Sequence, residues 1–392
     1  MYDKNVELDG ELVMILDRIE DPRSARGVRY SFSHLLLICI YGVLAGYSEA
    51  SEIAFYAKLN EEYFKEKLGI EKIPSHDTIS RILAMVNFEE LSANLNQWLE
   101  DNFHDLREKV MNLKVLHVDG KAVRAASKKQ KGEKPKYVLN AMYEGESIGL
   151  KVQEIGEKEN EISRLPDYLK QFNLKDTIVT IDAIGCNKTV INSIIDGGGS
   201  FVIPVKDNQK NLHKCIKKEI ERLNTTDKFT ELKSVKILSN EHGRIETMKC
   251  SLIENTEFVF EELGLKSFYG HIAKIGVFDK KVITLKDGEE TVTNTRSIFI
   301  TNMEEITADV FMKIKKAHWN IEMQHWLLDV QLYEDKMTAN KGNSMLNASI
   351  LRRFCMQMKK QDVEYAGKPM KRFLMANAHD INRIEKILLE KC

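Results

Sequence analysis

The pattern of hydrophobic and polar positions changes near residue 112 and divides the chain into a helical part and a mixed part. From about residue 6 to 110, apolar residues recur at spacings of three and four, as in ELVMILDRI, EIAFYAKL and LSANLNQWLEDNF. This spacing predicts amphipathic helices. The apolar run LLLICIYGVLAG, which starts at Leu35, is too short to span a membrane and predicts a core helix. We therefore expect an all-α N-terminal domain over residues 1–110.

The segment IPSHDTISRIL predicts a helix start, with Ser75 or Asp77 as the N-cap after Pro74. The helix that follows resembles the second helix of a helix-turn-helix motif, which would bring the N-terminal domain to DNA. A plain packing helix of an all-α domain fits the same residues, so both readings stay open.

Strand patterns dominate after residue 112. The runs KVLHVDG, YVLNAMYEG and IGLKVQEIG read as strands, EISRLPDYLKQF as a helix and DTIVTIDAIG as a further strand. Alternation of strands and helices predicts an α/β sheet with helices on its faces. We expect residues 111–228 to form the first part of this core, 229–303 a β-rich insertion and 304–392 a helical C-terminal part.

Composition limits the class of protein. The chain has 392 residues, of which 43% are hydrophobic and 30% charged, so it can bury a large core in two or three structural units. Its six cysteines show no C-x-x-C spacing, which argues against a disulfide framework or a zinc ribbon and fits a reducing cytosol. No signal peptide precedes the apolar run at Leu35. We expect a cytoplasmic protein without a membrane partner.

The charge is unevenly distributed, although the formal net charge is only −1. Between Lys121 and Lys136 there are seven basic residues and one acid, Glu133. Further basic clusters lie at residues 206–218, 313–316 and 352–360. One such cluster is consistent with a solvated face, but clusters beside candidate active-site acids also suit a polyanionic partner.

Two strands end on a carboxylate. Asp119 ends the apolar run of NLKVLHVDGKAVR, and Asp182 ends that of TIVTIDAIG. An isolated buried carboxylate is costly, so each needs a partner, a cap role or a metal. Neighbouring strands lie about 5 Å apart, so the two acids could share hard cations such as Mg²⁺ or Mn²⁺. Capping of the next element is the alternative.

A third candidate acid lies in KKAHWNIEMQHWLLDVQLYEDK. His318, Glu322 and His325 are at i, i+4 and i+7, which puts them on one face of a helix. The spacing is not the H-E-x-x-H of zinc proteases, and no cysteine lies nearby. A di-iron bundle would need a second E-x-x-H helix, which the sequence lacks.

Several segments together resemble a known family. DGKAVR, EKENEISRLPDYL, VTIDAIGCNKTV, VIPVKDNQKNL, HGRIET and HWNIEMQHWLLDVQLYEDK occur in the order seen in the H-repeat-associated, ISAs-type transposases of bacterial insertion sequences. DPRSARGVRYSFSHLLLICIYGVLAG and IPSHDTISRIL resemble the helical domain that accompanies that family. The resemblance spans nearly the whole chain. Lys316 and Met323 stand where the family usually has Arg and Asn.

The resemblance implies an RNase H-like catalytic core with a DDE triad, Asp119, Asp182 and Glu322. It implies two Mg²⁺ or Mn²⁺ ions, cleavage of the ends of a mobile element, and strand transfer into target DNA. The expected partner is double-stranded DNA, held by a homodimer and placing the protein at the nucleoid when bound. A simple two-metal nuclease, or an inactive or domesticated DNA-binding relative, is the alternative.

Candidates for DNA contacts lie around these acids. The basic candidates are Lys121, Arg124, Lys206, Lys210, Arg244 and Lys316. Asn208 and Gln209 are expected to contact DNA or brace their loop. His318 and His325 are expected to orient Glu322 or meet a phosphate, and packing beside Trp326 is the alternative for His325. Trp319 is expected in the core.

Overall fold

The computed structural model describes residues 10–24, 26, 28–102, 113–123, 136–143, 152–155, 161–241, 244–264, 268–286, 289–338 and 341–389. The chain divides into two compact units. Unit I comprises Met1–Glu108, Gly120–Glu157 and Glu322–Cys392, and unit II comprises Lys109–Asp119 and Lys158–Ile321. Two of the boundaries fall within elements, one within a strand and one within a helix. Each unit is described by itself.

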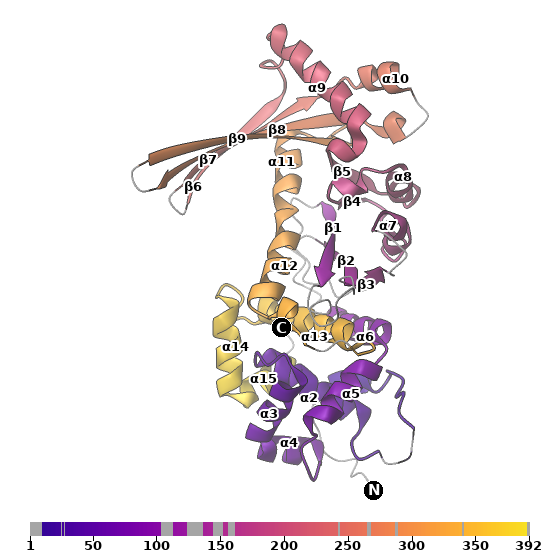
Figure 1. The fold of residues 1–392 in the computed structure, drawn as a ribbon, viewed down its shortest axis with the longest axis vertical. Helices are drawn as coiled ribbons and strands as arrows, with labels where there is room; N and C mark the ends of the chain where they lie inside the picture. Colours follow the sequence, from indigo (N-terminus) through magenta and orange to yellow (C-terminus); the bar gives the residue numbers. More distant parts are fainter. Residues whose placement is uncertain are drawn as a thin grey trace. The chain divides into compact units, whose positions relative to one another are not determined.

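Unit I is mainly helical, as the spacing of apolar residues predicts for its N-terminal part (Figure 1). Its N-terminal helices are α1 (Gly10–Leu16), α2 (Phe32–Leu44), α3 (Ala50–Leu59), α4 (Glu61–Leu68), α5 (His76–Met85) and α6 (Phe88–Asn102). Its C-terminal helices are α13 (Ser344–Gln361), α14 (Met370–His379) and α15 (Ile381–Leu389). Helix α2 is buried on nearly all sides, so the prediction of a core helix is confirmed.

The C-terminal helices share one hydrophobic core with the N-terminal ones. Leu351 and Phe354 of α13 and Phe373 of α14 belong to the same buried cluster as the side chains of α2 and α5. The amide of Asn347 also donates to the carbonyls of Leu83 and Val86, both at 2.9 Å. The structure therefore divides the chain differently from the expected domains. Residues 322–392 group with the N-terminal helices, and α13 buries much of its apolar surface against them.

Unit I also holds the antiparallel pair β2 (Lys136–Tyr143) and β3 (Val152–Ile155). In the order of the sheet these two strands follow β1, as β3-β2-β1, so they belong to the α/β sheet as predicted. In the part of the chain that the structure describes, no helix is long and apolar enough to cross a membrane.

Unit II is built on a mixed sheet. Its strands, in spatial order, are β1 (Lys114–Val123), β4 (Thr177–Thr180), β5 (Ser200–Val205), β9 (Glu289–Thr301), β8 (Lys274–Lys286), β7 (Arg244–Ile253) and β6 (Ser234–Glu241). The pairs β1–β4 and β4–β5 are parallel, and the pairs from β5 to β6 are antiparallel. The expected β-rich insertion therefore continues the sheet through β9.

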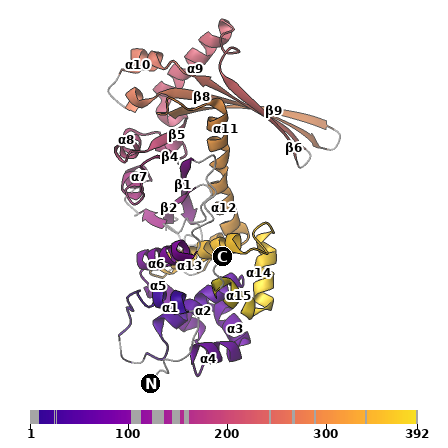
Figure 2. The ribbon, with the colours of Figure 1, turned by 180° about the vertical axis from the view of Figure 1, so that it is seen from behind.

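Helices cover both faces of this sheet (Figure 2). They are α7 (Glu161–Leu169), α8 (Lys188–Asp196), α9 (Lys210–Thr225), α10 (Glu257–Leu263) and α11 (Ala308–Ala317). Phe311 of α11 packs on Gly276 of β8, where an added Cβ would lie 2.9 Å from its ring. Phe229, which follows α9, lies under Lys249 and Arg296 on the other face. Helix α12 (Trp319–Val330) follows α11, and the unit boundary falls within it.

Candidate active site

The two strand-end acids are neighbours in unit II. Strands β1 and β4 run parallel, with His117 paired to Thr180. Asp119 and Asp182 each lie two residues further along. Asp182 follows the last residue of β4, as expected, whereas β1 continues past Asp119 to Val123, so the prediction that this strand ends on Asp119 is wrong. Because side chains alternate across a strand and neighbouring strands lie about 5 Å apart, this register brings the two carboxylates together. We call them the acid pair.

The charges of the acid pair repel each other. Asp182 is half-buried, and burial, followed by the charge of Asp119, raises the pKa of Asp182. Hydrogen bonds from the backbone N–H groups of Ile184 and Gly185 and the charge of Lys206 oppose this effect without cancelling it. A cation between the two carboxylates would relieve the repulsion, so this donor set suits a hard divalent ion.

Asp182 also caps the next element. Its Oδ1 accepts the N–H of Ile184 at 3.0 Å, at the start of the short helix Ala183–Gly185. The capping alternative is thus correct for one oxygen of Asp182, and this bond fixes the orientation of the carboxylate. No group of three or more His, Cys, Asp or Glu side chains suited to hold a metal occurs among the described residues.

Directly behind the acid pair lies a chain of three polar side chains. The hydroxyl of Thr180 is 2.6 Å from Nδ1 of His117 and 2.8 Å from Nδ1 of His318. A hydroxyl donates one hydrogen, so one imidazole accepts it and the other donates its own Nδ1–H to the oxygen. These hydrogen bonds connect β1, β4 and His318, the residue directly before α12.

The loop after Asp182 is braced by the segment after β5. Nδ2 of Asn208 donates to the carbonyl of Ala183 at 2.5 Å, and Nε2 of Gln209 donates to that of Cys186 at 2.8 Å. Of the two roles expected for Asn208 and Gln209, bracing is the one these contacts perform. Lys206, in the same segment, is exposed and lies close enough to Asp182 to lower its pKa.

The other basic candidates differ in their surroundings. Lys210 is exposed at the first residue of α9, and Lys316 is exposed in the last turn of α11. Arg124 lies outside the described residues.

Arg244 is remote from the acid pair. Strand pairing places Ser251 of β7 level with Val205, the last residue of β5. The pairs that connect them across the sheet are Val205–Ile298, Ile298–Val277 and Val277–Ser251. Arg244 lies seven residues further along β7, which corresponds to about 23 Å of extended strand. It therefore belongs to the outer part of the arm formed by β6–β9, and any DNA contact it makes is separate from the acids.

Lys121 is not available to a phosphate. In unit I its side chain is only 6% exposed, and its ammonium contacts Asp329 at 2.6 Å and the fully buried Glu334. Glu334 also accepts a hydrogen bond from Ser349. We call Lys121, Asp329 and Glu334 the lysine cluster. The prediction of a DNA contact for Lys121 is wrong because its charge is already neutralised inside the protein.

The pKa of Glu334 reflects this neutralisation. Burial alone would raise it, but the charges of Lys121 and Arg353 and the hydrogen bonds from Lys121 and Ser349 lower the pKa to about 2. Glu334 therefore stays ionised at neutral pH although no solvent reaches it.

The third candidate acid, Glu322, belongs to unit I, as the first residue after the boundary within α12. It is exposed in the first turn of this helix. Three residues further, Nε2 of His325 lies 3.2 Å from Nδ2 of Asn140 on β2. Trp319 is 58% exposed and Trp326 48%, so the expectation that Trp319 lies in the core is wrong.

Comparison with known proteins decides the family. Residues 112–358 match the family model described as "Transposase DDE domain", and residues 13–99 match "DDE_Tnp_1-associated". The chain belongs to the DDE transposase family. It is therefore a transposase of the insertion-sequence type, as the motifs indicate.

Full-length relatives support the assignment. The chain is 26% identical to the "H repeat-associated putative transposase YhhI" of Escherichia coli K12, with 94% of this chain and 95% of the relative covered. It is also 26% identical to "Putative protein YbfL" of the same organism, with the same coverage. An "Uncharacterized protein in dhlA 3'region" of Xanthobacter autotrophicus is 30% identical over 59% of this chain and 76% of its own length.

Sequence reasoning missed His117 and Thr180 as supports of the acid pair. A signal was present, because each lies two residues before one of the acids and so faces the same side of its strand. Each of these polar residues interrupts an apolar run at the same distance from an acid. This pattern indicates that the two side chains lie next to each other below the two carboxylates.

Proposed function

We propose that this transposase cleaves DNA at the ends of an insertion sequence and joins the freed 3'-hydroxyl to target DNA. We further propose that Asp119, Asp182 and Glu322 hold two Mg²⁺ or Mn²⁺ ions in an RNase H-like core. The observation that carries the proposal is the acid pair, two repelling carboxylates that lie two residues beyond the last pair, His117–Thr180, of adjacent parallel strands.

Glu322 is proposed as the third ligand from its place in the chain. It follows His318 by four residues, or about one helical turn, and the Nδ1 atom of His318 bonds to Thr180 beneath the acids. Its carboxylate is exposed and so can meet a ligand. The family pattern of two Asp and one Glu supports the same residue.

Each residue named in this proposal has a defined role. When bound, the ions would activate the attacking water or hydroxyl and stabilise the leaving oxygen. Asp119 and Asp182 would hold the ions, and the hydrogen bond that Asp182 accepts from the N–H of Ile184 keeps that carboxylate in one orientation. Lys206, Lys210 and Lys316 contact phosphates near the cleaved bond. No protein nucleophile is needed, so one site can serve both cleavage and joining.

The test is a cleavage assay on labelled duplex DNA that carries the element's own ends, with Mg²⁺ or Mn²⁺. Asp119→Asn, Asp182→Asn and Glu322→Gln are each expected to lower the rate about a hundredfold or more while DNA binding survives. Asp196→Asn and Glu304→Gln are matched controls, because both residues are exposed and lie outside the site. Normal cutting by Glu322→Gln would remove this residue from the triad.

A second assay separates a transposase reaction from simple nuclease action. A precut end with a free 3'-hydroxyl is incubated with a target plasmid, and joined products are measured. Joined products that require all three acids support strand transfer, whereas cleavage without joining supports a nuclease. Light scattering of the protein with and without two DNA ends tests the proposed homodimer.

A further inference from the structure

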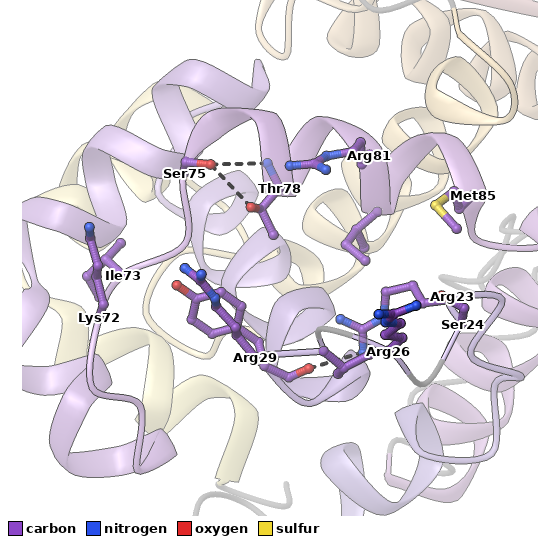
Figure 3. Close-up of a pocket in the computed structure, with 13 residues that line it drawn as sticks. Arg23, Ser24, Arg26, Arg29, Lys72, Ile73, Ser75, Thr78, Arg81 and Met85 are labelled. Carbon is purple, nitrogen blue, oxygen red and sulfur yellow. Dashed lines mark hydrogen bonds between the residues drawn. The ribbon is translucent and has the colours of Figure 1, made fainter.

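A second concentration of positive charge lies in unit I. Side chains from residues 23–30 and from α5 with the segment before it line a pocket of 630 Å³ (Figure 3). Its basic residues are Arg23, Arg26, Arg29, Lys72 and Arg81. None of the described residues that line it is acidic. The chain as a whole carries a net charge of −1, so this cluster is not a consequence of a basic composition.

Within the part of the chain that the structure describes, four of these five basic side chains have no carboxylate as an ion-pair partner. Arg23 forms hydrogen bonds of 2.8 Å to both oxygens of Asp21, and the bonds from Arg23 lower the pKa of that carboxyl. Among the described residues, by contrast, Arg26, Arg29, Lys72 and Arg81 form no ion pair with a carboxylate. Like charges held together without counter-charges repel, which an anionic ligand would relieve.

The α5 side of the pocket adds groups that suit a phosphate. Ser75 caps the helix by accepting the N–H of Thr78, and both hydroxyls line the pocket. Arg81 follows Thr78 by three residues and so lies on the same side of the helix, as Figure 3 shows. Guanidinium groups, hydroxyls and the positive end of a helix are the usual protein ligands of phosphate oxygens.

The opposite side of the pocket is formed by side chains from residues 23–30, where arginine occurs at every third position, as Arg23, Arg26 and Arg29. Figure 3 shows Arg23, Arg26 and Arg29 on the side of the pocket that faces α5. Val28 and Met85, which are 37% and 41% exposed, also line the pocket. Apolar side chains thus lie beside the cations.

We propose that this pocket binds the phosphate backbone of duplex DNA and so forms a second contact of the transposase with its substrate, in unit I rather than at the acid pair. The inference rests on the proposed function, which supplies DNA as the ligand. A single phosphate ion needs only one or two cationic side chains, whereas basic residues here come from two segments and face each other across the pocket. Such an arrangement fits a chain of phosphates.

The test is metal-free binding of the full chain to a fluorescein-labelled duplex of about 30 base pairs in EDTA, measured by anisotropy at several salt concentrations. The pocket variant is Arg26→Ala/Arg29→Ala/Arg81→Ala. The control variant, Arg18→Ala/Lys341→Ala/Lys371→Ala, removes the same charge from exposed residues of unit I outside the pocket. Circular dichroism checks that both variants fold.

We expect the pocket variant to bind roughly ten- to a hundredfold more weakly, and the slope of log K against log salt to fall by about 2 to 3. The control variant should bind within about twofold of wild type. Equal binding by the pocket variant and wild type would overturn the inference and leave the proposed function intact. Failure of the wild type to bind any duplex would count against both.

Titration with inorganic phosphate distinguishes the two sources of the ligand. Tight phosphate binding that the pocket variant loses, together with unchanged duplex binding, would assign the pocket to a small anion and overturn the DNA proposal.

A crosslinking residue provides a second readout. Met85→p-benzoylphenylalanine should crosslink to the duplex, whereas the same substitution at Val363, which is 89% exposed and outside the pocket, should not.

Discussion

The acid pair and the lysine cluster contrast two ways in which this protein places carboxylates away from solvent. In the lysine cluster, Glu334 has no exposed surface, yet its pKa is lowered to about 2 because Lys121 and Arg353 compensate its charge. In the acid pair, Asp182 is only half-buried, yet its pKa is raised by burial and by Asp119. The compensated group stabilises the fold, whereas the uncompensated pair is arranged for a ligand that supplies positive charge.

The two features are two residues apart in the sequence. Asp119 and Lys121 lie on the same strand, separated by Gly120, and belong to different units. Substitutions at the two positions should therefore affect different properties of the protein, and the following experiments test that separation.

The largest expected effect is on stability. Lys121→Ala leaves Glu334 buried without its main counter-charge, which should cost about 3–5 kcal/mol of unfolding free energy. Urea denaturation measures this. Lys206→Ala, at an exposed position beside the acid pair, is the control and should change the unfolding free energy by less than about 0.5 kcal/mol. Equal losses in both variants would contradict the contrast.

The acid pair should give the opposite pattern. Asp182→Asn removes one of two repelling charges but keeps an oxygen for the cap on Ile184, so the unfolding free energy should stay within about 1 kcal/mol of wild type. The cleavage rate should nevertheless fall about a hundredfold or more. A variant that loses stability and activity together would indicate that the acid pair is a structural feature.

The pH dependence of stability sharpens the comparison. The pKa of Glu334 is lower in the folded state than its ordinary value of 4.5, so its stabilising contribution is fully present above about pH 5. It is lost as the pH falls toward 2. A lowering of this size corresponds to roughly 3 kcal/mol.

Denaturation of wild type and Glu334→Gln between about pH 6 and pH 3 measures this contribution. The stability difference between the two proteins should shrink as the pH falls. A difference that stays constant over this range would show that Glu334 does not titrate with a lowered pKa.

The smallest effect is expected at the hydrogen bonds behind the acid pair. Thr180→Val keeps the shape of the side chain but leaves two imidazoles without their shared partner, at a cost of about 1–2 kcal/mol. Because His318 directly precedes α12, cleavage should also slow by roughly tenfold. Thr180→Ser, which keeps the hydroxyl, should restore the cleavage rate. If it does not, the role of Thr180 is packing alone.

Local patterns in the sequence were sufficient for the acid pair. An apolar run that ends on an acid is recognisable in the sequence, and two such runs in an α/β pattern predict that the acids meet. The end of β1 was not recognisable in this way, since the strand continues past Asp119 to Val123. The helical N-terminal part, the cap at Ser75 and the β-rich insertion were recognisable for the same reason, since each depends on residues close together in the chain.

The predictions that failed depend on residues far apart in the chain. Lys121 looks like a phosphate ligand until Asp329 and Glu334, more than two hundred residues later, are seen to contact it. Trp319 looks like a core residue until α12 is seen to leave it 58% exposed. The basic pocket, which the sequence analysis did not predict, joins arginines near residue 26 with Arg81.

The sequence by itself determined the family, most of the elements and the two acids, because motifs, periodicity and chain direction can be read from the order of residues. Only the tertiary structure decided which charges are compensated, that the C-terminal helices complete the N-terminal core, and that five cations line one pocket. The physical reason is that burial and Coulomb interactions depend on distance in space, which the order of residues along the chain does not specify.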